Sequence, residues 1–341
     1  MLAARYLGPG LLEAVDVPLP TIASDEALIE VEACGFCGSD LSIVAGTHPR
    51  AKAPLTLGHE ICGRIVQIDG AHSGLSIGDR VAVYPLIVCG ECHACTHGSD
   101  HVCRTLRLFG IDVDGGMAQY VRLPISSLVK LPPAMPARIG ALIEPLAVAV
   151  HGVNRASLDS ASLDGVEHAV VMGAGPIGLM TALVAQARGV PHVVISDVLP
   201  SRLELAASLG LHAVSAGDEL RDTVMKRTNE NGADLVFECA GAPTTAGVMT
   251  ALVRSRGVIV NLGVFKKPVE VDLQAINFKE IQVLGSRVYR REDFDAAIDL
   301  AMGLPLDRIV THTFPMAGVT EAFQKFRAGE VCKALILPNG E

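Results

Sequence analysis

The sequence predicts an α/β protein with two domains, one rich in strands and one built on a doubly wound parallel sheet. Its 341 residues exceed the usual size of a single hydrophobic core. Up to about residue 130 the apolar runs are short and separated by Gly, Pro, Asp and Ser. From about residue 141 to residue 284, strand-like runs alternate with amphipathic helical runs, as in a parallel sheet with helices on both faces. This change of pattern separates the two domains.

Short apolar runs in the first domain predict strands at residues 27–34, 63–69 and 79–85. Three segments, GSD, APLTLGHE and DVDGG, are expected to be loops, at residues 38–40, 53–60 and 112–116. Loops are places where irregular backbone can direct ligands toward a site.

Four cysteines with the spacing C-x2-C-x2-C-x7-C lie in one short stretch, at Cys89, Cys92, Cys95 and Cys103. Four thiolates fit the tetrahedral shell that zinc prefers, and the short spacers let one loop enclose the ion. The alternative is a disulfide pair or a chance cluster. A site with four protein ligands has no open position, so we expect a structural zinc that stabilises a lobe at about residues 86–105.

Three histidines, His93, His97 and His101, lie among these cysteines. Because four thiolates already complete a zinc shell, we expect these histidines to be solvated loop residues.

A glycine motif stands between a strand-like run and a helical run, with Gly173, Gly175 and Gly178 in G-x-G-x-x-G order. Gly173 permits a tight turn, Gly175 lets the backbone approach a pyrophosphate, and Gly178 allows close packing of the helix. A helix beginning near Pro176 directs its positive end at the phosphates. We predict that these residues and Ile177 bind a dinucleotide; the alternative is a tight turn without a nucleotide.

Asp197 ends the next strand-like run, 19 positions after Gly178. An acid at about this distance binds the hydroxyls of the adenosine ribose, and its charge would repel a 2'-phosphate. We therefore predict NAD as the cofactor. The alternative for Asp197 is an N-cap of the following helix. Arg202 reaches either the ribose or only solvent.

Three later strands are expected at residues 234–238, 258–262 and 281–285. Their C-terminal ends should face the cofactor. The candidate contacts on the nicotinamide side are Leu262, Gly263, Gly285, Ser286 and Arg287.

Three separated segments, CGFCGSD, GHE and IEPLAVAVHG, offer ligands of the type that zinc binds. With these segments, the four-cysteine loop, GAGPIG and GSRVY in order, the chain resembles the zinc-dependent medium-chain dehydrogenases, particularly the polyol branch typified by sorbitol and butanediol dehydrogenases. The resemblance implies a GroES-like catalytic domain of residues 1–145 and 287–341. It also implies a Rossmann NAD-binding domain of residues 146–286.

The resemblance implies that Cys37, His59 and Glu144 bind a catalytic zinc, with a fourth position open for water or substrate. Glu60 is then a neighbouring carboxylate that binds the zinc through water or replaces that water transiently. Each ligand has an alternative: Cys37 as a small buried hydrophobe, His59 as a partner of loop backbone, Glu144 as a helix cap.

The resemblance also implies the chemistry. Zinc lowers the pKa of the substrate hydroxyl, and hydride passes to the nicotinamide. Ser39 is expected to carry the departing proton, or else to make only a turn hydrogen bond. Asp40 is expected to orient His59. Many relatives carry His where this chain has Ser42, and His48 is a candidate replacement in the proton relay.

Other polar residues have simpler expectations. The pair Cys34 and Cys37 matches C-x-x-C, but no βαβ context of a thioredoxin-type site surrounds it. The remaining cysteines outside the lobe, Cys34, Cys62, Cys239 and Cys332, are expected to be small buried hydrophobes. Arg287, Tyr289 and Arg290 either bring positive charge to the substrate or form ion pairs at the domain boundary.

The expected function is a zinc- and NAD-dependent oxidation of a secondary alcohol of a polyol, vicinal diol or sugar derivative to a ketone. The alternatives are an L-threonine 3-dehydrogenase and a non-enzymatic dinucleotide-binding scaffold or redox sensor. We expect two zinc ions per chain, a small hydroxylated substrate, and a homotetramer or homodimer. The net charge of −9 argues against nucleic-acid and membrane partners. Nine cysteines without an export signal favour the cytoplasm.

Overall fold

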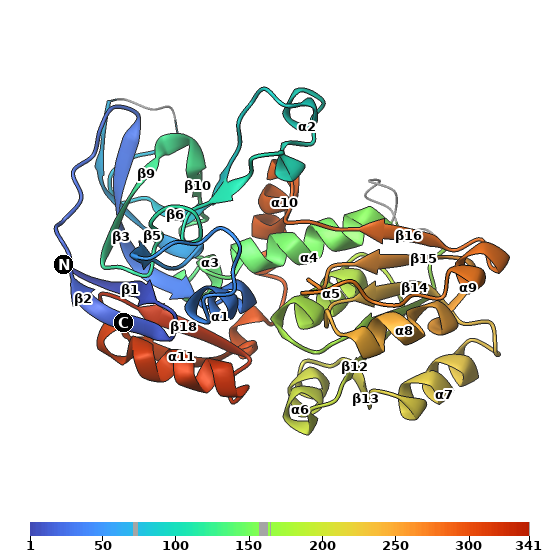
Figure 1. Cartoon of the computed structure of the whole chain (residues 1–341). Helices are drawn as coiled ribbons and strands as arrows, with labels where there is room; N and C mark the ends of the chain where they lie inside the picture. The colour runs from blue at the N-terminus through green and yellow to red at the C-terminus, as the bar shows by residue number, and fades with distance from the viewer. Residues whose placement is uncertain (71–73, 157–162, 164, 341) are drawn as a thin grey trace. The chain divides into compact units, whose positions relative to one another are not determined.

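The computed structural model describes residues 1–70, 74–156, 163 and 165–340. The chain forms two compact units, and the first is made of two separate parts of the sequence, Met1–Glu144 and Arg290–Glu341. The second unit is Pro145–Tyr289. Both termini belong to the first unit, as the blue and red ends of the ribbon show (Figure 1).

The first unit is built on a seven-stranded sheet of order β10-β6-β5-β3-β18-β17, with β9 paired to β3. Its strands are β3 (Glu26–Gly35), β5 (Glu60–Ile68), β6 (Arg80–Val83), β9 (Tyr120–Pro124), β10 (Leu128–Lys130), β17 (Val310–Pro315) and β18 (Lys333–Leu337). The strands expected at 27–34, 63–69 and 79–85 are confirmed as β3, β5 and β6. Strand β18 belongs to the second part of the sequence in this unit and β3 to the first, so their pairing joins the two parts in one sheet.

Two smaller sheets accompany it, of order β2-β1-β4 and β7-β8. Their strands are β1 (Leu2–Gly8), β2 (Leu11–Asp16), β4 (Leu55–Thr56), β7 (Leu86–Ile87) and β8 (Arg107–Leu108). The helices of this unit are α1 (Gly38–Val44), α2 (His93–Thr96), α3 (Ala137–Gly140), α10 (Arg291–Ala301) and α11 (Val319–Ala328).

The loop expected at residues 38–40 is wrong, because these residues begin α1. Asp40 explains the helix: its Oδ2 accepts the backbone N–H of Cys37 at 2.9 Å, which caps the first turn. The segment 53–60 also differs from a plain loop, since it contains the short strand β4.

The second unit is a six-stranded parallel sheet of order β13-β12-β11-β14-β15-β16. Its strands are β11 (His168–Met172), β12 (His192–Asp197), β13 (His212–Ser215), β14 (Ala233–Glu238), β15 (Val253–Asn261) and β16 (Gln282–Gly285). Its helices are α4 (Ile143–Ala156, which begins in the first unit), α5 (Pro176–Ala187), α6 (Pro200–Ser208), α7 (Asp218–Arg227), α8 (Pro243–Leu252) and α9 (Leu273–Phe278).

Helices α5 to α8 pack against the strands of this sheet, so its central strands are covered and read as continuous apolar runs. Val170, Val236 and Ile259 lie in its core and are almost completely buried. The strand order reverses between β11 and β14, which is where sheets of this class bind ligands. None of the helices in the described ranges is long and apolar enough to cross a membrane.

Candidate active site

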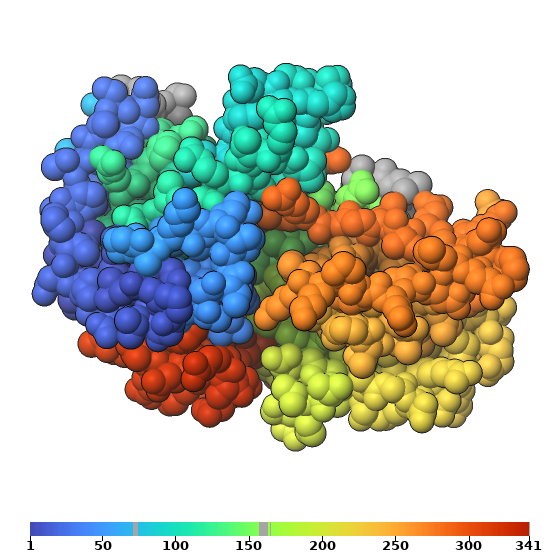
Figure 2. All heavy atoms as spheres, in the orientation of Figure 1, coloured from blue at the N-terminus to red at the C-terminus, as the bar shows by residue number. Residues whose placement is uncertain are grey.

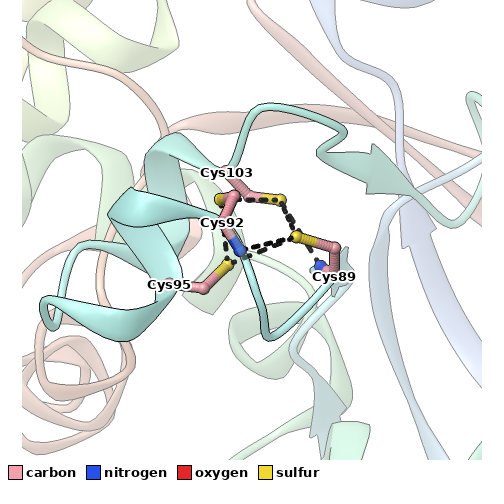
Figure 3. A group of neighbouring side chains, drawn as sticks. All are labelled: Cys89, Cys92, Cys95 and Cys103. Carbon is pink, nitrogen blue, oxygen red and sulfur yellow. Dashed lines mark hydrogen bonds between the residues drawn. The ribbon is translucent and has the colours of Figure 1, made fainter.

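The four cysteines of the lobe point toward one another (Figure 3). Their Sγ–Sγ distances are 3.5 Å for Cys92–Cys95 and Cys89–Cys103, and 3.9 Å for Cys89–Cys95 and Cys92–Cys103. Four thiolates around one zinc ion stand about 3.8 Å apart, from a Zn–S distance of about 2.3 Å. All four cysteines are free of disulfides. This donor set fits a zinc ion, and the disulfide alternative is wrong.

The lobe projects from the rest of the first unit, as its teal atoms show in Figure 2.

Within the cluster, the pKa of one thiol is lowered and that of its neighbour is raised. Hydrogen bonds from the backbone of Arg104 and Cys95 lower the pKa of Cys92 to about 6. Burial and the bond to Cys92 raise the pKa of Cys95 to about 12. Cys92 is thus held as a thiolate beside Cys95, which stays protonated near neutral pH. A zinc ion would take the place of that proton, because thiols bind metal as thiolates.

The histidines of the lobe differ from one another. His93 and His97 are exposed and their rings stack at 4.1 Å. The expectation of a solvated loop residue is wrong for His101, which is only 6% exposed. His101 lies within the 3-10 turn η1 (Asp100–Val102), which leads to Cys103 and places the His101 side chain in the interior.

A second group of ligands forms where β3 meets β5. Cys37 follows β3, and His59 and Glu60 stand at the start of β5; their ligand atoms all lie within 4.8 Å of one another. The antiparallel register places Gly35 opposite Glu60. A Cβ at Gly35 would overlap the Glu60 carboxylate, so glycine at this position makes room for it.

Lys333 completes this group from β18. Its side chain is 3% exposed, and its ammonium forms an ion pair with Glu60 and donates to the Phe36 carbonyl oxygen at 2.8 Å. Burial opposes its charge, but Glu60 and Cys37 raise the pKa of Lys333 overall. Sequence reasoning missed this residue; a lone lysine at the start of the apolar run KALIL was the available signal.

His59 is buried, and its Nδ1 finds no hydrogen-bond partner among the described residues. Burial opposes protonation of its ring, but Cys37, Glu144 and Asp40 outweigh burial and raise its pKa to about 10. Glu144 is buried and acts on His59 through its charge, yet it lies outside the tight group of three. An imidazole with a free nitrogen, surrounded by a thiol and carboxylates, fits a divalent metal ion such as zinc.

Two polar side chains beside Cys37 have open positions. Asp40 is fully buried, and its hydrogen bond goes to the Cys37 backbone, so it acts on His59 through charge. Burial raises the pKa of Asp40 to about 6. The Ser39 hydroxyl oxygen is buried without a hydrogen-bond partner among the described residues. The Ser42 hydroxyl donates to the Ser39 carbonyl oxygen at 2.7 Å, which directs it back into α1.

His48 lies in the loop after α1. Its Nδ1 accepts the backbone N–H groups of Arg50 and Ala51, at 3.3 and 3.2 Å. Burial and the Arg50 charge lower the pKa of His48. This ring is therefore neutral near pH 7, with its proton on Nε2.

The glycine motif of the second unit has three distinct environments. Gly173 has φ +104, which a residue with a side chain rarely adopts. Gly175 is open: a Cβ there would meet only Arg202 Nη1, at 4.0 Å. At Gly178 a Cβ would overlap the Gly173 carbonyl oxygen. Helix α5 begins at Pro176, so its unpaired N–H groups face the open space beside Gly175.

Asp197 holds this loop to the end of β12. Its two carboxylate oxygens accept the backbone N–H groups of Ala174 (2.8 Å) and Leu199 (3.0 Å), and Arg202 lies 3.4 Å away. The alternative of a helix cap is wrong, because the N-cap of α6 is Leu199.

The remaining cofactor candidates follow the ends of two strands. Leu262 and Gly263 come directly after β15, and Gly285 ends β16. The Ser286 N–H donates to the Asn261 carbonyl oxygen at 2.9 Å, and Arg287 is exposed.

Tyr289 and Arg290, which follow β16, have different surroundings in the structure. Tyr289 is fully buried, and Arg290 pairs with Glu292 at 3.5 Å. This favours the ion-pair expectation for Arg290.

Of the cysteines expected to be buried, Cys239 alone is only half-buried.

Two family models match the chain. "Alcohol dehydrogenase GroES-like domain" matches residues 23–133, and "Zinc-binding dehydrogenase" matches residues 176–302. The first covers Cys37, His59, Glu60 and the four-cysteine lobe. The second begins at Pro176, within the glycine motif, and covers Gly178 and the strands β12 to β16.

Known proteins of several substrate classes resemble the chain over nearly all of its length. The 2-dehydro-3-deoxy-L-galactonate 5-dehydrogenase of Pseudoalteromonas atlantica is 36% identical and covers 100% of both chains. An L-threonine 3-dehydrogenase of Chelativorans sp. is 36% identical (94% of this chain, 93% of the relative). A sorbitol dehydrogenase of Halalkalibacterium halodurans is 33% identical (97% of each). Among solved structures, a zinc-binding dehydrogenase from Sinorhizobium meliloti 1021 bound to NADP is 33% identical, with a TM-score of 0.90 over 99% of each chain.

Proposed function

This chain belongs to the zinc-dependent medium-chain dehydrogenase family, and from that premise we propose that it oxidises a secondary alcohol of a polyol, vicinal diol or sugar derivative to a ketone, with zinc and NAD. The observation that carries this proposal is the convergence of the half-buried Cys37 with the buried His59 and Glu60 in one group. A scaffold with only a structural metal has no use for this second set of ligands.

Each residue of this site has a separate role in the proposed reaction. Zinc, when bound, supplies the Lewis acidity that lowers the pKa of a substrate hydroxyl, and NAD accepts the hydride. Cys37, His59 and Glu144 hold the metal in this proposal, and Glu60 is a carboxylate whose charge Lys333 balances. The Ser39 hydroxyl, which has no partner among the described residues, is free to accept the proton of the substrate. The four cysteines of the lobe hold a second, structural zinc.

The substrate class is proposed from both the relatives and the site. A sugar-acid dehydrogenase and a sorbitol dehydrogenase resemble the chain over almost its whole length. L-threonine 3-dehydrogenases resemble it equally well, so this activity is the second candidate. The Ser42 hydroxyl, turned back onto the Ser39 carbonyl, argues against the second candidate, because relatives often carry a relay histidine at this position.

We propose NAD over NADP because the carboxylate of Asp197 lies at the ribose end of the site, where a 2'-phosphate would meet a like charge. Arg202 beside it offsets part of that repulsion, and one similar structure holds NADP. Both cofactors therefore belong in the test.

We further propose that the chain assembles as a homotetramer or, second, a homodimer. Strand β16 ends the six-stranded sheet with Val283 43% exposed, and Phe278 before it is 79% exposed. Edges of this kind are commonly covered in assemblies. We place the protein in the cytoplasm, because its free cysteines suit a reducing compartment. Light scattering of the purified protein tests the assembly.

A substrate panel tests the activity. The zinc-loaded chain is incubated with polyols, vicinal diols, sugar acids and L-threonine, each with NAD and with NADP, and the reduced cofactor is followed by absorbance. We expect turnover with a polyol, diol or sugar derivative and NAD. Turnover with L-threonine alone would support the second candidate, and no turnover in a chain that still binds one zinc would support the scaffold.

A further inference from the structure

We propose that Glu238 is a positioning residue for the dinucleotide, because its buried carboxylate fixes the two loops that form the β14–β15 side of the cofactor site. This inference rests on the proposed cofactor function. It assigns a role to a residue of the second unit, whereas both groups of candidate metal ligands lie in the first.

The Glu238 carboxylate is fully buried and accepts hydrogen bonds from one loop. Its Oε1 accepts from the N–H groups of Ala240 (3.1 Å) and Gly241 (2.9 Å) and from the Thr245 hydroxyl (2.6 Å). Its Oε2 accepts a further contact from the Gly241 N–H at 3.1 Å. Ala240 and Gly241 lie in the loop before α8, and Thr245 lies in the first turn of α8. All three groups donate hydrogen bonds to the carboxylate oxygens.

The backbone of Glu238 holds the second loop. Its carbonyl oxygen accepts the N–H groups of Leu262 (2.9 Å) and Gly263 (2.8 Å), which follow β15. A Cβ at Gly263 would overlap the Glu238 carboxylate, and a Cβ at Gly241 would lie 3.0 Å from the Val264 carbonyl oxygen. The two loops are therefore packed against each other around a single carboxylate, with glycines where no side chain fits.

This carboxylate stands at the edge where the cofactor is expected. Glu238 pairs in register with Met172, the residue before Gly173, and on its other side with Asn261. The strand order reverses between β11 and β14, so the Glu238 loop and the glycine motif face the same crevice. At Gly173 a Cβ would lie 3.0 Å from the Ala240 nitrogen, so the two walls touch.

The consequence is specific to one half of the cofactor. In a doubly wound sheet the strands on the two sides of the reversal bind the two nucleotide halves. Asp197 and the glycine motif lie on the β11–β12 side, and the Glu238 loops lie on the β14–β15 side. Loosening the Glu238 loops should weaken binding of the nicotinamide half and leave the adenosine half intact.

The same strand offers a matched control at its other end. Asp234 on β14 also accepts two backbone N–H groups, from Glu167 (3.0 Å) and His168 (2.8 Å), and it pairs with Arg254. Asp234 therefore fixes neighbouring backbone by hydrogen bonds, as Glu238 does, but at the opposite end of β14 from the glycine motif. A substitution at Asp234 therefore shows how the loss of such hydrogen bonds affects stability when the cofactor loops are left unchanged.

Calorimetry of NADH and AMP binding to the full chain tests the proposal with Glu238→Gln and Asp234→Asn. In Glu238→Gln an amide N–H₂ faces backbone donors, so we expect NADH affinity to fall about tenfold or more while AMP affinity is unchanged. Asp234→Asn should lower the Tm and leave the affinity for both ligands unchanged. Wild-type NADH affinity in Glu238→Gln, or an equal loss in Asp234→Asn, would overturn the proposal.

Two further variants keep the test decisive if Glu238→Gln fails to fold. Thr245→Val removes one donor from the carboxylate and should weaken NADH binding by a smaller factor, again without changing AMP binding. Glu238→Asp keeps the charge and should retain more NADH affinity than Glu238→Gln. Equal NADH affinity in Thr245→Val and wild type would count against the role. A wild-type chain that binds no NADH would instead refute the proposed function.

Discussion

Two groups of candidate metal ligands lie in the first unit, and they differ in composition and surroundings. The lobe offers four thiols of one kind, close together in sequence and projecting from the unit. The Cys37–His59–Glu60 group mixes thiol, imidazole and carboxylate, and its His59 and Glu60 are buried near the paired strands β3, β5 and β18. Four thiolates complete the shell of a zinc ion, whereas the three ligands proposed at the second site, Cys37, His59 and Glu144, would leave a position open.

The difference teaches how one metal can serve two purposes in one unit. The four cysteines of the lobe lie in one short segment, so a zinc ion bound there would contribute mainly to stability. At the buried site, the β3–β5 register and the Glu60–Lys333 ion pair fix the positions of the ligands. Removing a ligand should therefore affect stability at the lobe and chemistry at the buried site.

The largest expected effect is on turnover at the buried site. His59→Ala removes the imidazole whose Nδ1 has no partner among the described residues, and turnover should fall by roughly a thousandfold or more. NADH affinity, measured by calorimetry, should be unchanged. His93→Ala, an exposed histidine of the lobe, is the matched control and should keep wild-type turnover. An active His59→Ala enzyme would refute the assignment of His59.

The next effect is on stability at the lobe. Cys95→Ser breaks the four-thiolate set, so the chain should lose one zinc and at least about 3 kcal/mol of stability. Chemical denaturation and metal analysis measure the two losses. Cys239→Ala, a half-buried thiol of the second unit, should retain both zinc ions. If Cys95→Ser lost activity but no stability, the lobe would not be structural.

A third effect separates the ion pair from the metal ligands. Lys333→Met leaves the Glu60 carboxylate buried without its partner, which should cost about 3–5 kcal/mol of stability. The double variant Lys333→Met with Glu60→Gln removes both charges and should recover most of that loss. Denaturation curves of the two variants and of Glu60→Gln alone complete the cycle. Additive losses would show that the two charges are not coupled.

The smallest expected effect is on stability, from the ion pairs that Glu32 forms with Arg80 and Arg64. These residues belong to neither group of candidate metal ligands. Burial opposes the charge of Glu32, but Arg80 and Arg64 outweigh it and lower its pKa. The contribution of Glu32 is therefore present at neutral pH and is lost as the pH falls through its lowered folded-state pKa. Glu32→Gln should cost about 1 kcal/mol at pH 7, since the side chain is partly solvated.

The check is the pH dependence of unfolding. The stability difference between wild type and Glu32→Gln should shrink as acid protonates Glu32, and zinc content at pH 7 should not change. A difference that stays constant with pH would contradict the charge-based explanation.

Sequence reasoning succeeded where the site is local in the chain. The four cysteines and the glycine motif each lie within a short segment, so their spacing alone predicts the geometry. The loop expected at residues 38–40 was wrong because the capping by Asp40 was not considered.

What sequence missed depends on pairing between distant strands. Lys333 reaches Glu60 only because β18, from the end of the chain, pairs with β3. The role of Glu238 appears only when β14 is set in register with β11 and β15. No local spacing carries these relations, so a lone charged residue in an apolar strand was the most that the sequence could offer.

Cobalt substitution tests the central claim, that one unit holds a closed structural site and an open reactive one. The optical bands of cobalt report ligand type and geometry, so the two sites have distinct spectra. We predict that adding NADH and an alcohol of the accepted class changes only the bands that His59→Ala abolishes, and leaves those that Cys95→Ser abolishes. Bands from the four-thiolate site alone, or a response to alcohol that persists in His59→Ala, would contradict the account.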